Sequence, residues 1–242
     1  MNDFTSFARR AKFVDRQLKQ STIDRLFVTA NFEAEDQPNN PDKQLIRFEF
    51  IELLIRIAGA KYKESGICKT WTDAFEKLWL DNVAPISEGH LWQGFREEHL
   101  YSVDVNDVFV ANDDTLRKLY ARYYTLTKKW MSTEDAIDLF CVESECCLSN
   151  KEALYCHGMS KMTNPYENDN PERYQKLQYA EFLEMIGRVA ELKYRGSEQE
   201  SLPLAEKIET ILDQLFVVLG PTAKRKEVDV DMEILTESDS DY

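Results

Sequence analysis

One segment of sixteen residues occurs twice in the chain, with starts 132 positions apart. Residues 47–62 read RFEFIELLIRIAGAKY, and residues 179–194 read YAEFLEMIGRVAELKY. Both contain a Glu-Phe pair, carry apolar side chains at steps of three and four, and end in Lys-Tyr. This spacing is typical of an α-helix, and so many apolar positions predict a helix that is contacted on several sides. The sequence therefore predicts two related helical units.

The segments around the two copies also correspond. In each half a capped helix comes first, followed by an Asn/Pro-rich loop, the Glu-Phe helix, a polar connection and one further helix. Ser149 and Glu152 form a clear capping box for the second of these units. With only 8 Gly and 7 Pro, helix is the favoured structure throughout. We predict a basic N-terminal helix (1–20), a first unit (21–85), connecting helices (86–142), a second unit (143–220) and an acidic tail (221–242).

The fold class is therefore all-α, and we expect one continuous body. Helices are predicted at 3–19 and at 114–129, the second one after short apolar stretches at 103–110. The pattern leaves open whether the two Glu-Phe helices meet in one core or each nucleate a lobe of their own. The side chains expected to form the core on these helices are Phe50, Leu54, Ile57, Phe182, Ile186 and Val189.

A helix, a polar loop and a second helix that opens with Glu-Phe resemble the EF-hand proteins of the calmodulin type. Leu177, Glu181 and Phe182 match loop positions 8 and 12 and the residue after the loop, and Leu45, Glu49 and Phe50 match them in the first unit. The resemblance implies that the residue at position 8 makes a short β-bridge to a paired loop. It also implies that the phenylalanine packs in the core of the pair.

The calcium-binding half of each loop departs from the EF-hand pattern. Calcium needs oxygen ligands at positions 1, 3, 5 and 12 and glycine at position 6. Tyr174 and Gln175 occupy positions 5 and 6 of the second loop, and Pro38 and Lys43 occupy positions 1 and 6 of the first. We therefore expect no cofactor, with the helix–loop–helix geometry kept and the metal lost. If calcium bound at all, its ligands would come from Asn170, Glu172, Glu181, Asn40, Asp42 and Glu49.

The charge of the chain limits its partners. A net charge of −14 argues against general binding to nucleic acid or to anionic membranes. No stretch is apolar enough for a secretory signal or a membrane span, and five irregularly spaced cysteines suggest reduced thiols inside the cell. A basic cluster near the N-terminus could bind an acidic protein such as tubulin, through Arg9, Arg10, Lys12, Arg16 and Lys19. Ser238 and Ser240 precede acidic residues, as the targets of acid-directed kinases do, although the tail can also be read as a solubilising segment.

No motif predicts catalysis. The chain has no Gly-rich phosphate loop, GxSxG elbow or HExxH sequence, and the spacing of Cys146, Cys147, Cys156 and His157 fits no common zinc site. Degenerate EF-hand proteins of protist cilia and flagella are similar in style. That resemblance implies a non-catalytic structural or adaptor protein on axonemal microtubules in the cytoskeleton. The alternatives are a calcium-sensing regulator and, more remotely, an enzyme of unknown class.

Overall fold

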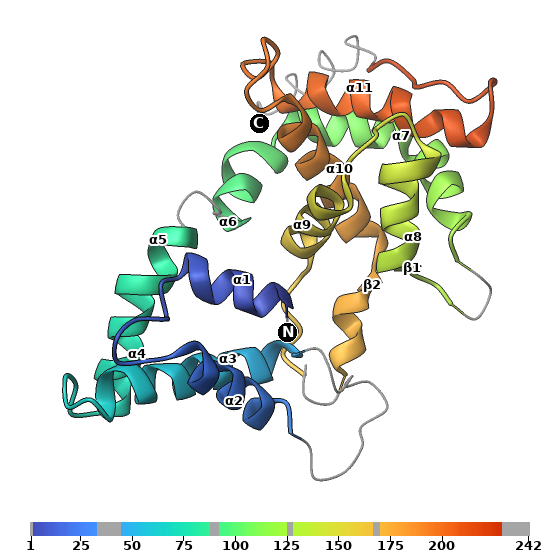
Figure 1. Ribbon diagram of the computed structural model, residues 1–242. Coiled ribbons are helices and arrows are strands. Elements are labelled where there is room, and N and C mark those ends of the chain that lie inside the picture. Colours follow the sequence, from blue (N-terminus) through green and yellow to red (C-terminus); the bar gives the residue numbers. More distant parts are fainter. Residues whose placement is uncertain (1, 33–44, 88–91, 125–127, 167–169, 229–242) are drawn as a thin grey trace, which may run out of the picture. The chain divides into compact units, whose positions relative to one another are not determined.

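The computed structural model describes residues 2–32, 45–87, 92–124, 128–166 and 170–228 (Figure 1). The chain divides into two compact units, Met1–Leu91 with Pro165–Glu172, and Trp92–Asn164 with Arg173–Tyr242. Within the described residues the regular structure is helical apart from two strands of two residues each, which confirms the all-α prediction. No helix in the described ranges is long and apolar enough to cross a membrane.

The first unit is built around the first copy of the repeated helix. Its elements are α1 (Asn2–Arg10), α2 (Gln20–Ala30), α3 (Arg47–Ala58), α4 (Trp71–Leu78) and α5 (Ala84–Ser87). Helix α3 continues as a π-helical turn to Lys63, and α4 continues likewise to Val83. Helix α3 packs against both α2 and α4. Leu54 and Ile57 are buried as predicted, whereas Phe50 is only partly buried and packs against the rings of Phe4 and Phe7.

The N-terminal helix is shorter than the predicted 3–19. It ends at Arg10, and Lys12 takes a left-handed conformation with φ of 52°. Asn82 Nδ2 donates to the carbonyls of Ala11 at 2.7 Å and Lys12 at 3.2 Å, and Lys61 Nζ donates to Phe13 O at 3.0 Å. Residues 11–18 therefore form a turn that is fixed by hydrogen bonds from the side chains of Asn82 and Lys61 to the carbonyls of the turn. Phe13, in this turn, is fully buried.

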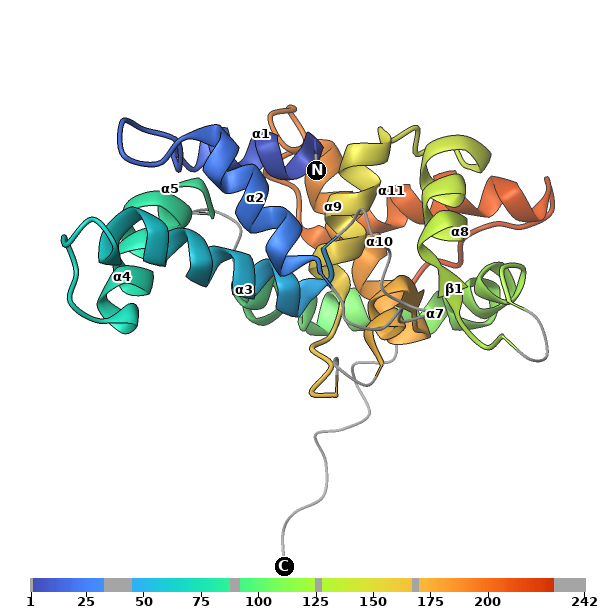
Figure 2. The same ribbon diagram turned by 60° about the horizontal axis from the view of Figure 1, so that its bottom comes forward.

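The second unit contains more helices around the second copy. Its elements are α6 (Trp92–Phe95), α7 (Val103–Ala121), β1 (Met131–Ser132), α8 (Thr133–Asp138), α9 (Asn150–Ser160), β2 (Lys176–Leu177), α10 (Tyr179–Tyr194) and α11 (Leu204–Phe216). Helix α6 runs on as a π-helical turn to Leu100, and α8 runs on to Glu143. Helix α10 packs between α9 and α11, and α7 packs against α11 (Figures 1 and 2). The predicted core residues Phe182, Ile186 and Val189 are all buried.

Helix α7 differs most from its prediction. It begins at Val103 and ends at Ala121, where a helix over 114–129 was expected. The side chain of Ser102 caps it by accepting a hydrogen bond from Val105 N. Val105 and Val108, expected in short apolar stretches before the helix, lie inside it and are buried.

The two strands join two helix–loop–helix segments of the second unit. Met131 pairs with Leu177 and Ser132 with Lys176 in an antiparallel ladder. Leu177 was expected to make a bridge of this kind, but its partner lies in the region 86–142 that was predicted to be connecting helices. Residues 92–142 of this region are therefore an integral part of the second unit.

The lysine near the end of each repeated helix makes a corresponding contact in the two units: it donates a hydrogen bond to a backbone carbonyl of a turn. Lys61 Nζ donates to Phe13 O, and Lys193 Nζ donates to Cys146 O at 2.9 Å, so Lys61 holds the turn that leads to α2 and Lys193 holds the turn that leads to α9. Lys12 and Cys147, in these two turns, are the non-glycine residues with positive φ in the described chain. The two copies nevertheless belong to two separate clusters of buried side chains, so each has a core of its own.

The predicted tail begins later than residue 221. Lys226 N donates to Asn112 Oδ1 at 2.7 Å, and Asn112 Nδ2 donates back to Lys226 O at 3.1 Å. Ala223 and Val228 pack against the second core. Residues 221–228 are thus a strap on the second unit, and 229–242 lie outside the described residues.

Candidate functional site

The loop before α10 contains Glu181, the best-placed of the predicted ligands. Its carboxylate is buried, with 1% of the side chain exposed. Glu181 Oε2 accepts a hydrogen bond from Gln178 N at 2.8 Å, and Oε1 accepts one from Met162 N at 3.0 Å. The first bond caps α10, and the second ties this helix to the chain leaving α9.

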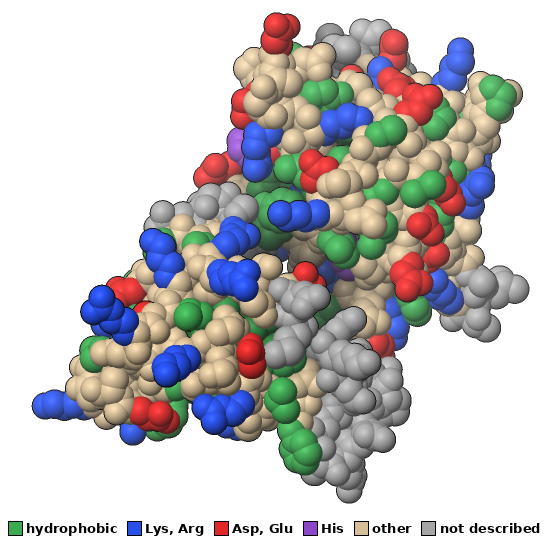
Figure 3. Space-filling view, in the orientation of Figure 1, with side chains coloured by type: hydrophobic (Ala, Val, Ile, Leu, Met, Phe, Trp, Pro, Cys, Tyr) green, Lys and Arg blue, Asp and Glu red, His purple; other side chains and the backbone are tan. Residues whose placement is uncertain are grey.

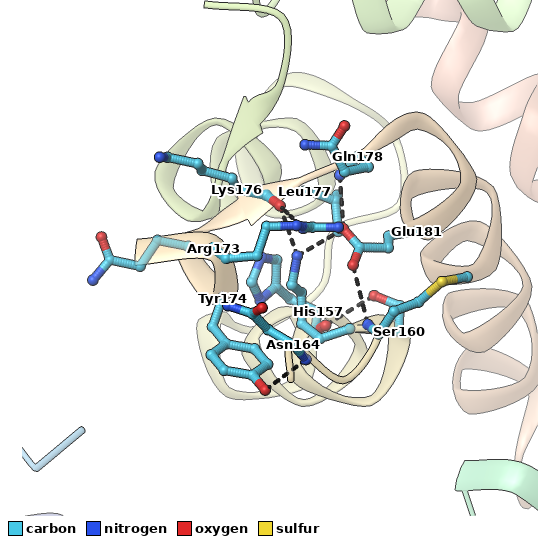
Figure 4. Close-up of polar contacts among 12 residues, drawn as sticks. His157, Ser160, Asn164, Arg173, Tyr174, Lys176, Leu177, Gln178 and Glu181 are labelled. Carbon is cyan, nitrogen blue, oxygen red and sulfur yellow. Dashed lines mark hydrogen bonds and ion pairs between the residues drawn. The ribbon is translucent and has the colours of Figure 1, made fainter. Parts of the chain in front are cut away.

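Two basic side chains hold the same carboxylate (Figure 4). Lys161 Nζ lies 2.7 Å from Glu181 Oε2 and 2.6 Å from Lys176 O. Arg173 Nη1 reaches the same two oxygens, at 3.2 and 3.0 Å. Lys176 and Glu181 are the residues that the EF-hand resemblance puts at loop positions 7 and 12. Two cations of the chain therefore bind one oxygen of each of these residues.

Burial and hydrogen bonding set the charge of this cluster. Burial by itself would raise the pKa of Glu181, but hydrogen bonds from Gln178 N, Lys161 and Met162 N outweigh it and lower that pKa. Burial lowers the pKa of Lys161 by more than the Glu181 carboxylate raises it. The carboxylate is therefore ionised at neutral pH, with its positive partner supplied by the chain itself.

His157, on α9, closes one side of the cluster. Burial, and then the positive charge of Lys161, lower the pKa of His157 to about 4. Its Nε2 lies 3.3 Å from Thr133 Oγ1, so the ring joins α9 to the start of α8. A histidine with this pKa stays neutral at physiological pH and does not act as a switch there.

The other predicted ligands of this loop group with a different unit from Glu181. Residues 165–172, which include Asn170 and Glu172, group with the first unit, whereas Glu181 belongs to the second. When the Asn170 amide is oriented with its nitrogen toward Glu172, Asn170 Nδ2 donates to the two oxygens of the Glu172 carboxylate at 2.5 and 2.8 Å. Within the described ranges, no group of three or more His, Cys, Asp or Glu side chains could hold a metal ion.

The matching glutamate of the first copy has a capping role. Glu49 Oε2 accepts a hydrogen bond from Ile46 N at 3.0 Å at the start of α3. Its side chain is buried. Asn40 and Asp42, the other predicted ligands of that loop, lie outside the described residues.

Each copy contains a Glu–Arg ion pair four residues apart, but the two pairs lie in different surroundings. Glu52 and Arg56 pair on an exposed face of α3, at 2.6 Å. Glu184 and Arg188 are buried, and Glu184 also accepts from Arg96 Nε at 2.8 and 3.0 Å. The second pair is therefore part of a buried triad of ions that joins α10 to the turn after α6.

The basic side chains near the N-terminus are exposed. Arg9 and Arg10 lie on α1, and Lys12, Arg16 and Lys19 on the turn that follows. Figure 3 shows Lys and Arg side chains spread over the face of the first unit that is turned to the viewer. Ser238 and Ser240, the predicted phosphorylation sites, lie outside the described residues.

The cysteines behave as packing residues where they are buried. Burial raises the pKa of the Cys146 thiol, and it raises that of Cys156 to about 12. Thiols of this kind are poor nucleophiles and poor metal ligands. Cys147, which follows Cys146 in the chain, is exposed.

The sequence analysis did not predict that Lys161 and Arg173 bind Glu181, or that residues 131–132 form a strand that pairs with residues 176–177. Lys161 and Arg173 are basic residues beside a loop that is expected to carry acidic ligands if it resembles an EF-hand, and this contrast was a usable signal. Met131 is followed four positions later by Asp135, whose carboxylate accepts from Ser132 N at 2.9 Å. This spacing repeats that of Leu177 and Glu181, but no Glu-Phe pair marks it.

Comparison with known proteins finds no matching family model, no matching curated protein and no matching solved structure.

Proposed function

We propose that this chain is a non-catalytic structural or adaptor protein whose helix–loop–helix units are degenerate EF-hands. The observation that carries the proposal is the position of Lys161. Its ammonium group contacts Lys176 O and Glu181 Oε2, where an EF-hand would place its metal ion. A loop that carries its own cation keeps one shape whether or not calcium is present, which suits a static component of an assembly.

Further features support the degenerate EF-hand part of the proposal. Leu177, at loop position 8, lies in a two-residue antiparallel ladder, and Phe182 is fully buried. Helices α3 and α10 each pack between the helices before and after them, in keeping with a duplication. The pairing of residues 131–132 with 176–177, together with the shared spacing from Met131 to Asp135 and from Leu177 to Glu181, suggests a third degenerate hand over 103–143.

A calcium titration tests this proposal against its main alternative, a calcium sensor. We expect calorimetry on the full chain to show no heat of binding at micromolar Ca²⁺, and circular dichroism to stay unchanged. Micromolar binding together with a change in helix content would establish the sensor instead. An enzyme remains the remote alternative and would be supported by turnover of any substrate class at this site.

A cytoskeletal, axonemal setting is the sharpest form of the proposal. The exposed basic side chains of the first unit match an acidic surface such as that of tubulin. Deleting residues 1–20 would be a poor test, because Ala8 and Phe13 belong to the core. Charge reversal is cleaner: we expect R9E/R10E/R16E to lose co-sedimentation with microtubules.

The matched control reverses three exposed lysines of the second unit, K118E/K129E/K151E, and should co-sediment like the wild type. If the wild-type chain does not pellet with microtubules, the microtubule setting is wrong. The structural role itself is then still tested by the calcium titration.

A further inference from the structure

The turn between α1 and α2, residues 11–19, has a lysine in a backbone conformation that favours glycine; we call this segment the basic turn (Figure 2). Helix α1 ends in a Schellman motif, in which Phe13 N donates to Ala8 O at 3.0 Å. In the same motif Lys12 N donates to Arg9 O at 3.1 Å. The motif holds Lys12 in the left-handed region, with φ of 52°. A lysine is less stable there than a glycine, because its Cβ crowds the backbone.

Lys19, at the other end of the basic turn, is also disfavoured by its position. It is the N-cap residue of α2, and its side chain makes no capping hydrogen bond. Ser, Thr, Asp and Asn are preferred at N-caps, and the helix dipole repels a cation there. Arg9 and Arg10 differ, since the dipole favours cations at the C-terminal end of α1, where they lie. Lys12 and Lys19 thus have no local structural explanation.

The acidic side chain of the basic turn is bound within the fold. Asp15 is the only acid between Asp3 and Asp24. Its Oδ1 accepts hydrogen bonds from two backbone amides of the turn, at 2.8 Å each, and its Oδ2 binds the buried ammonium group of Lys61. The turn and the helix end before it expose five bases, Arg9, Arg10, Lys12, Arg16 and Lys19. Their positive charge is therefore not offset by an acid of this stretch.

The backbone of the basic turn is fixed by buried side chains. Asn82 donates to the carbonyls of Ala11 and Lys12, and Lys61 donates to that of Phe13. Phe13 itself belongs to the first core. The turn is thus ordered before any partner arrives, and binding costs little backbone entropy.

Charge and burial together select the class of partner. Five exposed bases on one short stretch complement a segment rich in carboxylates. A membrane fits less well: Phe4 and Phe7 of α1 pack against the first core, and the exposed apolar side chain of the turn is Val14, at 38%. Nucleic acid is opposed by the net charge of −14.

We propose that the basic turn binds an acidic segment of a partner protein. Lys12 and Lys19 serve this contact although they destabilise the ends of α1 and α2. Segments rich in Asp and Glu are commonly disordered in isolation, so the partner's carboxylates adapt to the fixed turn. The proposal rests on the proposed function, because it concerns the same basic side chains, and it adds the kind of segment that they bind.

A titration of the full chain with a fluorescent oligo-glutamate peptide tests the proposal. K12G and K19S should each weaken binding about twofold to fivefold, as expected for loss of one exposed charge contact. Each should also raise Tm by about 2–4 °C, because glycine suits the left-handed position and serine suits the N-cap. Lower affinity with higher stability separates a binding role from a structural one.

The matched control is K151S, which removes an exposed lysine from the first turn of α9 in the second unit. It should bind the peptide like the wild type. The proposal is overturned if the wild-type chain does not bind the peptide, or if K12G/K19S binds it as tightly as the wild type. Preference for vesicles that contain phosphatidylserine would overturn it too, and would assign the turn to a membrane.

The microtubule setting fails in a different way. Peptide binding that K12G/K19S weakens, without co-sedimentation of the wild-type chain, would reject that setting and support the basic turn as a site for acidic segments. Co-sedimentation without peptide binding would do the reverse. Both lysines are exposed, so the variants keep the core, and the Tm measurement verifies that they fold.

Discussion

At the scale of single residues, Lys161 has the clearest energetic role. Its side chain is 6% exposed and binds a glutamate that is 1% exposed. Removing one partner of a buried ion pair leaves an uncompensated charge, and here Arg173 compensates only in part. We expect K161M to lower the free energy of unfolding by roughly 2–4 kcal/mol in urea denaturation.

The exposed pair on α3 supplies the control. Glu52 and Arg56 have side chains that are 44% and 40% exposed, and we expect R56M to cost less than about 1 kcal/mol. Equal stabilities of K161M and R56M would contradict a structural role for the internal cation.

His157 makes stability depend on pH. Its pKa is about 4 in the folded chain against 6.5 in the unfolded chain, so the unfolded state takes up the proton first as the pH falls. The contribution of His157 to the free energy of unfolding is fully present above pH 6.5. It falls by roughly 3 kcal/mol in total as the pH drops from 6.5 to 4. Urea denaturation between pH 7 and 5 should show this slope, and H157Q should flatten it. H99Q, at an exposed histidine, should keep the slope, and a flat wild-type profile would refute the prediction.

At the scale of elements, replacing either of two helical glycines by alanine is expected to change the stability of the chain in opposite directions. A Cβ at Gly187 of α10 would lie 2.7 Å from Leu100 Cδ1, whereas a Cβ at Gly158 of α9 would meet open space. We expect G187A to destabilise the chain by about 1–3 kcal/mol through overpacking. G158A should stabilise it by about 0.5–1 kcal/mol, because alanine loses less entropy in a helix. Thermal unfolding of both variants checks this, and two changes of the same sign would contradict the packing described for α10.

At the scale of the whole molecule, the two cores should respond separately to mutation. Leu54 is buried in the first core and Ile186 in the second. We expect L54A to destabilise by roughly 2–5 kcal/mol and to speed hydrogen exchange in residues 45–63 while sparing 179–194. I186A should do the reverse. Faster exchange in both regions of either variant would mean that the units unfold together.

The local signals in the sequence were sufficient for most helices. The Ser149–Glu152 capping box and the spacing of apolar residues in both copies depend only on neighbours within four positions, and the structure has them as predicted. Helix α7 was misplaced because its first residues, VDVNDVFV at 103–110, spread their apolar side chains around a helix instead of gathering them on one face. Its helical state depends on burial of Val105 and Val108 against distant segments.

What the sequence determined by itself is the helical class, the duplicated Glu-Phe helix and the departure of its loops from a calcium ligand set. These follow from residue types and short-range spacing. The tertiary structure decided that Leu177 pairs with Met131, that each copy has its own core, and that Lys161 and Arg173 share the oxygens of Lys176 and Glu181. Such contacts join residues up to 46 positions apart, and their free energy comes from burying charges and apolar surface together, which no local pattern records.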